Sequence, residues 1–148
     1  MQNQVHSVRI VVIDDNRDIA SSTKMLLAYL GHQVWTAHTG PAGVALVREV
    51  IPDLVLCDIG LPGMTGYEVA ESLRHDPSLS STRLCAVTAY RGDQAEEASR
   101  WAGFEKHLVK PVAPEELLAV VASCFTGRPA APHATLDMAA SASLCAGS

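Results

Sequence analysis

The sequence lacks the features that mark several common classes of protein. It has no excess of positive charge, because 11 lysines and arginines stand against 16 aspartates and glutamates, whereas nucleic-acid binding usually needs a basic face. No apolar run approaches the roughly 20 residues that cross a membrane. The polar start, Gln2 to Gln4, is not a secretion signal. We therefore expect a cytoplasmic protein that binds neither DNA nor membranes.

The cysteines and histidines have no pattern typical of a metal or redox site. The four cysteines form no CxxC pair, and Cys57 and Cys85 lie within apolar runs, as reduced core thiols do. The six histidines lack the spacing of zinc ligands. Trp35 and Trp101 are expected to be packing residues. At 148 residues, the chain is long enough for one domain with a hydrophobic core.

What the sequence does contain is a fivefold alternation of apolar runs and helical patterns. Val8 to Ile13 is apolar almost throughout, as in a strand covered on both faces. Gly31 stops the first helix, and Pro114 suits the first position of the last one. The alternation predicts a doubly wound parallel sheet. The expected strands are 8–13, 33–37 (at an edge), 54–57, 84–87 and 106–109, and the expected helices are 19–30, 40–50, 67–76, 92–102 and 114–125, the last with an apolar face that includes Phe125.

The composition divides the chain into three parts. From Gly127 onward it changes to Ala, Ser, Pro and Gly without apolar periodicity, so we expect 127–148 to be a mostly disordered tail. This tail is too short and too polar for a DNA-binding domain. Residues 1–7 are expected to be an N-terminal extension, and 8–126 the folded domain.

Four of the apolar runs end in a reactive polar residue. The first ends in Asp14 and Asp15, the third in Asp58, the fourth in Thr88 and the fifth in Lys110. Ligands of open parallel sheets bind outside the carboxyl ends of the strands. Three carboxylates gathered there would repel one another unless a cation joined them, and Mg²⁺ prefers oxygen ligands. The pattern therefore predicts a magnesium site.

Phosphoryl transfer is a reaction that such a site can support. Asp58 stands alone, whereas Asp14 and Asp15 form a pair suited to metal binding, so Asp58 is the candidate nucleophile for an acyl phosphate. Lys110 offers a mobile cation for a phosphoryl oxygen, and Thr88 offers a hydroxyl.

The motifs at these strand ends resemble those of one family. Val-Ile-Asp-Asp-Asn, Leu-Cys-Asp-Ile-Gly-Leu-Pro-Gly-Met-Thr-Gly, Val-Thr-Ala-Tyr and His-Leu-Val-Lys-Pro occur in the order and spacing of the receiver domain of two-component response regulators, over about Val8 to Phe125. The resemblance implies a flavodoxin-like (βα)5 fold with strand order 2-1-3-4-5. It also implies that Asp58 takes phosphate from a phosphohistidine on a histidine kinase or phosphotransfer protein.

The resemblance further assigns roles to individual residues. Mg²⁺ would be ligated by Asp15, Asp58 and the backbone carbonyl of Gly60, with Asp14 acting through water. Thr88 and Lys110 would bind the phosphoryl group, and the Lys110–Pro111 peptide bond would be cis.

In the family, a threonine and an aromatic residue carry the signal to a distant face. Here the threonine is Thr88, and the aromatic position, three residues before Lys110, holds His107. His107 is interpreted either as an ordinary strand residue or as a switch. The expected output surface comprises the fourth helix, the fifth strand and the fifth helix, including Glu96, Glu97 and His107.

The function implied is phosphorylation-dependent signalling by a protein that is not a conventional enzyme, although it catalyses its own phosphorylation and dephosphorylation. The chain would be a stand-alone regulator or the receiver portion of a hybrid histidine kinase. Two further classes stay open: a phosphate-independent binding module, and an aspartate-nucleophile phosphatase, which would want an acid where Gly60 stands. The downstream target and a phosphorylation-dependent homodimer are not decided by the sequence.

Overall fold

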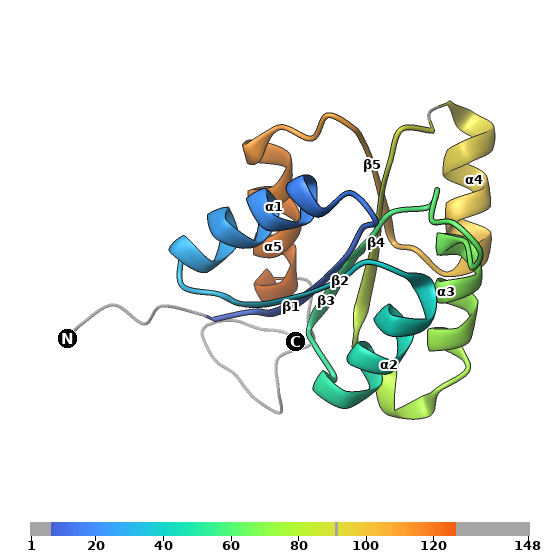
Figure 1. Ribbon diagram of the computed structural model, residues 1–148, viewed down its shortest axis with the longest axis horizontal. Coiled ribbons are helices and arrows are strands. Elements are labelled where there is room, and N and C mark those ends of the chain that lie inside the picture. The colour runs from blue at the N-terminus through green and yellow to red at the C-terminus, as the bar shows by residue number, and fades with distance from the viewer. Residues whose placement is uncertain (1–6, 91, 127–148) are drawn as a thin grey trace. The chain divides into compact units, whose positions relative to one another are not determined.

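The computed structural model describes residues 7–90 and 92–126 of the chain (Figure 1). The predicted tail 127–148 and all of the predicted extension except Ser7 lie outside the described residues, as does the side chain of Phe125. Strands and helices alternate as predicted. The elements are β1 (Arg9–Ile13), α1 (Arg17–Tyr29), β2 (Gln33–Ala37), α2 (Gly40–Val50), β3 (Leu54–Cys57), α3 (Gly66–Arg74), the 3-10 helix η1 (Pro77–Leu79), β4 (Arg83–Thr88), α4 (Asp93–Ala102), β5 (Lys106–Val109) and α5 (Pro114–Thr126).

The five strands form one parallel sheet in the order β2-β1-β3-β4-β5, which confirms the predicted order. The polar strand β2 lies at an edge, as expected. The central strand β3 is buried along its whole length, because it has neighbours on both sides and is covered on both faces. Helix α1 lies on one face of the sheet, and α2, α3 and α4 lie on the other (Figure 1).

Local side-chain hydrogen bonds fix the ends of the helices. Asn16 caps α1 by accepting from the Ile19 backbone N–H. Thr65 and Glu68 form a reciprocal capping box at the start of α3. After α1, Gly31 adopts a left-handed φ of 100°, as its position predicted.

The two tryptophans differ in their surroundings. Trp35 packs against the core, and the Arg9 guanidinium lies 5.5 Å from its ring centroid. Trp101 is 83% exposed, so the expectation that it packs is wrong. It lies on the solvent side of α4, whereas Ser99 and Ala102 face inward.

The chain divides into two compact units, and the boundary between Leu117 and Leu118 falls within the sequence of α5. In the part of α5 that follows Leu118, the Ser123 hydroxyl donates to the Val120 carbonyl oxygen over 2.6 Å. Within residues 7–90 and 92–126, no helix combines the length and apolar character needed to cross a membrane.

Candidate functional site

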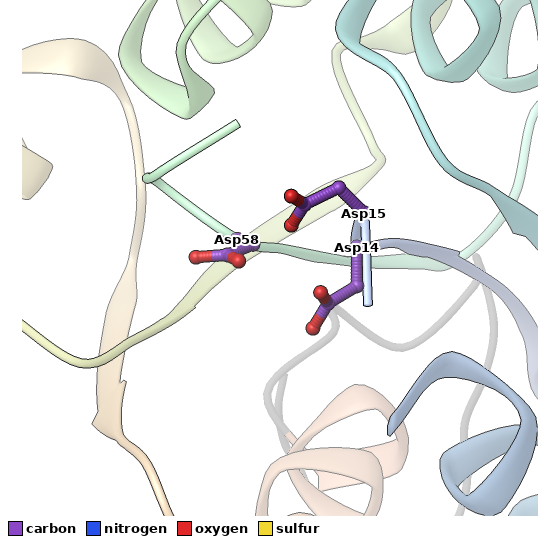
Figure 2. A group of neighbouring side chains, drawn as sticks. All are labelled: Asp14, Asp15 and Asp58. Atoms are coloured by element: carbon purple, nitrogen blue, oxygen red, sulfur yellow. The ribbon is translucent and has the colours of Figure 1, made fainter. Parts of the chain in front are cut away.

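The register of the sheet brings the predicted site residues to one edge. Ile13 pairs with Cys57, and Cys57 with Ala86, so the residues that follow β1 and β3 are neighbours. Each of Asp14, Asp15 and Asp58 contributes an oxygen to a group whose members lie within 4.8 Å of one another. Figure 2 shows these three side chains gathered beyond the strand ends. The structure thus forms the acidic cluster that the sequence predicted.

Asp14 is held at its backbone N–H, at its carbonyl oxygen and at both carboxylate oxygens. Its backbone N–H donates to Ala37, and its carbonyl oxygen lies 3.0 Å from His38 Nδ1. Its Oδ1 accepts from the Asn16 backbone N–H at 2.9 Å, and its Oδ2 accepts from Lys110 Nζ at 2.8 Å. Because it is only 3% exposed, this carboxylate is a fixed part of the site.

Asp58 is also held at its backbone and at both carboxylate oxygens, over slightly longer distances at the carboxylate. Its backbone N–H donates to the Ile13 carbonyl oxygen, which places it directly beside β1. Oδ1 accepts from the Gly60 backbone N–H at 3.1 Å, and Oδ2 accepts from Lys110 Nζ at 3.2 Å. The residue is 8% exposed, so it is buried at its base and reachable at its tip.

Lys110 connects the ends of three strands. Its backbone N–H donates to the Thr88 carbonyl oxygen, while its ammonium contacts Asp14 and Asp58. Burial alone would lower the pKa of Lys110, but the hydrogen bonds and charges of the two aspartates outweigh burial and raise the pKa above its ordinary value. The Lys110–Pro111 bond is cis, as the resemblance implied.

The charges of the site fit a divalent cation. Three carboxylates and one ammonium give a formal charge of −2, namely three negative charges less one positive. Asp15 is exposed and therefore open to a ligand from solvent. An all-oxygen set with this charge suits Mg²⁺. Asp14, Asp58 and Lys110 also line a cavity of about 460 Å³.

Thr88 and Gly60 lie near Tyr90. Thr88, at the end of β4, is 1% exposed, and its Oγ1 accepts from the Tyr90 backbone N–H at 3.2 Å. A Cβ added to Gly60 would lie 3.6 Å from the Tyr90 hydroxyl oxygen and 4.0 Å from Asp58 Oδ1. Gly60 therefore leaves a small gap between the phenol and the acidic cluster.

His107 makes its described contacts away from the carboxylates. Its Nδ1 lies 2.8 Å from Ser99 Oγ on α4, and its Nε2 lies 2.9 Å from the Tyr90 carbonyl oxygen. Neither interpretation of His107, as an ordinary strand residue or as a switch, predicted these two contacts.

A family model described as the response regulator receiver domain matches residues 10–122. The chain belongs to this family. Receiver domains are signalling modules, distinct from conventional enzymes, that generally bind Mg²⁺ at an acidic pocket. The family interacts with histidine kinases or phosphotransfer proteins and with downstream targets.

Two relatives and one solved structure illustrate the similarity of this chain to other receiver domains. The chain is 33% identical to the protein PilH of Pseudomonas aeruginosa over 119 residues, covering 80% of this chain and 98% of PilH. It is 34% identical over 116 residues to the virulence sensor protein BvgS of Bordetella pertussis, covering 75% of this chain and 9% of BvgS. A solved CheY-like response regulator receiver domain from Methanospirillum hungatei has a TM-score of 0.74 at 31% identity, covering 82% of this chain and 96% of that one.

Sequence reasoning missed three residues that support the site. They are His38, which contacts the Asp14 carbonyl oxygen, Ser99, which contacts His107, and Asn16, whose N–H binds Asp14. Asn16 was detectable as a helix cap, since it precedes a helical pattern. For His38 and Ser99 no local signal exists, because both contacts join segments that only the fold brings together.

Proposed function

We propose that Asp58 is the phosphoacceptor of this receiver domain, spanning residues 8–126. A carboxylate oxygen of Asp58 attacks the phosphorus of a phosphohistidine. The P–O bond forms as the P–N bond breaks, and the leaving imidazole nitrogen keeps the electron pair and takes up a proton. Attack by water on the acyl phosphate later returns Asp58 and inorganic phosphate. In this sense the domain catalyses its own phosphorylation and dephosphorylation.

The observation that carries this proposal is the position of Asp58 between a cation and two acids. Lys110 Nζ lies 3.2 Å from its Oδ2, and one oxygen each of Asp14, Asp15 and Asp58 lie within 4.8 Å of one another. Asp15, Asp58 and the Gly60 carbonyl would hold Mg²⁺, with Asp14 acting through water. When bound, Mg²⁺ would neutralise the carboxylates and bind phosphoryl oxygens. Lys110 and the Thr88 hydroxyl would bind the remaining oxygens.

The phosphorylated form would change partner contacts through Thr88 and His107. The proposed output face includes α4 and β5, with Glu96 and Glu97 exposed and His107 partly exposed, and α5 as its third element. Such a change is a population shift biased by new charge at Asp58. The donor would be a histidine kinase or phosphotransfer protein.

Incubation with Mg²⁺ and acetyl phosphate tests this function. We expect a mass gain of one phosphoryl group that is absent in Asp58→Asn. An unmodified protein would contradict the proposal, and rapid turnover of many phosphoesters would favour a phosphatase instead. A phosphatase is disfavoured because Gly60 offers no second acid. A phosphate-independent module is disfavoured because the ammonium and three carboxylates are brought together.

A further inference from the structure

A continuous series of hydrogen bonds joins the end of β4 to helix α4. The Tyr90 backbone N–H donates to Thr88 Oγ1 over 3.2 Å. The carbonyl oxygen of the same Tyr90 lies 2.9 Å from His107 Nε2, and His107 Nδ1 lies 2.8 Å from Ser99 Oγ. Ser99 and Thr88 are each 1% exposed. The two ends of the series are therefore shielded from competing water, whereas the central contact of His107 with Tyr90 is exposed.

The partners of His107 determine where its protons lie. A carbonyl oxygen can only accept, so Nε2 must carry the proton that is donated to Tyr90. In the neutral imidazole, Nδ1 is then an acceptor, and the Ser99 hydroxyl donates to it. The Tyr90 carbonyl oxygen thus selects the Nε2–H tautomer of His107, and the Ser99 hydroxyl, bound to the other ring nitrogen, fixes the plane of the ring.

The other end of the series orients the Thr88 hydroxyl, which the proposed function assigns to the phosphoryl group. The Tyr90 N–H occupies one lone pair of Thr88 Oγ1. A hydroxyl that accepts in this way keeps its own proton for another acceptor. A phosphoryl oxygen on Asp58 would be such an acceptor.

We propose that Ser99 is a positioning residue for the phosphorylated state. Through His107 and the backbone of Tyr90, whose C=O and N–H lie on either side of its Cα, it holds the Thr88 hydroxyl ready to donate to the phosphoryl group. The inference rests on the function proposed above. Because coupling between two sites is reciprocal, a phosphoryl group on Asp58 stabilises the contact between Ser99 and His107 and so fixes α4 against β5.

The test measures the affinity of the full chain for beryllofluoride, a phosphoryl mimic, by calorimetry in the presence of Mg²⁺. Four proteins are compared: the wild type, Ser99→Ala, His107→Phe and the double variant. Ser72→Ala is the matched control, because Ser72 is a helix serine whose hydroxyl contacts Arg48 on the α2–α3 surface. We expect Ser99→Ala to weaken binding about threefold to tenfold, the effect of losing one hydrogen bond. Ser72→Ala should leave the affinity unchanged.

The double variant separates positioning from a general loss of packing. If Ser99 acts through His107, Ser99→Ala should cause no further loss in the His107→Phe background. Nitrogen-15 NMR should show the Nε2–H tautomer of His107 in both the wild type and Ser99→Ala, with the Nδ1 signal shifted in Ser99→Ala by the loss of its hydrogen bond. Unchanged affinity in Ser99→Ala, or an equal loss in both backgrounds, would overturn the inference. A wild type that binds no beryllofluoride would instead overturn the proposed function.

Discussion

The ammonium nitrogen of Lys110 lies 3.2 Å from Oδ2 of Asp58, although 52 positions separate the two residues in the chain. The same nitrogen lies 2.8 Å from Asp14 Oδ2. One cation thus joins acids from the ends of β1 and β3. A phosphoryl group on Asp58 would add negative charge beside this cation, so Lys110 is placed to form an ion pair with a phosphoryl oxygen.

Replacing Lys110 with methionine should separate metal binding from phosphoryl binding. The change removes the positive charge but keeps an unbranched stem, so the three carboxylates should attract Mg²⁺ more strongly. We expect Mg²⁺ affinity to rise about threefold to tenfold, corresponding to roughly 1 kcal/mol, and beryllofluoride affinity to fall at least tenfold. Titration calorimetry measures both. Lower affinity for Mg²⁺ would show that Lys110 supports the metal site through its packing.

Asp15 should matter for the metal and little for the fold. Asp15→Asn removes one proposed ligand charge at an exposed position, so Mg²⁺ affinity should fall about tenfold or more. The free energy of unfolding without metal should stay the same or rise, because repulsion with Asp14 and Asp58 decreases. Asp18→Asn, a nearby exposed acid on α1, is the control and should keep normal Mg²⁺ affinity. Equal losses in both variants would indicate a general charge effect, not ligation.

Much of the fold could be predicted because apolar runs, and the glycines and prolines at which elements begin or end, are local signals. The predicted bounds of β3 and β5 are those observed, and α5 begins at Pro114 as expected. The acidic cluster followed from one rule, that parallel strands present their carboxyl ends at a common edge. The 3-10 helix η1 was missed, and β4 extends one residue further at each end than predicted.

Other features depend on contacts that only the fold creates. Ile51 ends α2 in a left-handed conformation with φ 49°, which a branched residue rarely adopts. The contact of Ser99 with His107 joins a helix to the following strand. Isoleucine has no preference for a left-handed backbone, and serine has none for a contact with a distant histidine, so both features become visible only in the assembled domain.

Gly66 should be intolerant of any side chain. A Cβ at this position would overlap the Asp58 carbonyl oxygen and lie 2.7 Å from Ile59 Cα, both of them backbone atoms. Gly66→Ala should therefore lower the free energy of unfolding by more than about 2 kcal/mol. It should also weaken Mg²⁺ binding, because the loop after Asp58 must move.

Gly60→Ala is the matched control for this loop. Its added Cβ would make ordinary contacts, the nearest at 3.6 Å to the Tyr90 hydroxyl oxygen. Chemical denaturation should show a change below about 1 kcal/mol for Gly60→Ala. Similar stability of the two alanine variants would contradict the close packing of Gly66 on Asp58.

His32 should make stability depend on pH on the acid side of neutrality. Burial lowers the pKa of His32 from its ordinary value of 6.5, and its Nδ1 accepts from the Val8 backbone N–H at 3.1 Å. A lowered pKa means that the unfolded chain binds the proton more tightly. The contribution of His32 is therefore complete above pH 6.5 and is lost as pH falls through the folded value.

Urea denaturation across this pH range checks the expectation. The wild type should lose no more than about 1 kcal/mol through His32, the value of one hydrogen bond, and His32→Gln should show a flatter profile. The control is His75→Gln, which replaces an exposed histidine at the C-terminal cap of α3 and should keep the wild-type slope. A wild-type slope in His32→Gln would contradict the assignment.

Locating the phosphoryl group within the chain tests the central claim most directly. The full chain is treated with acetyl phosphate and Mg²⁺ and then with sodium borohydride, which reduces an acyl phosphate to an alcohol, and its peptides are sequenced by mass spectrometry. We predict that the residue at position 58 is converted to homoserine and that Asp14 and Asp15 are unchanged. Reduction at Asp14 or Asp15, or no reduction at all, would contradict the role of Asp58 as the phosphoacceptor.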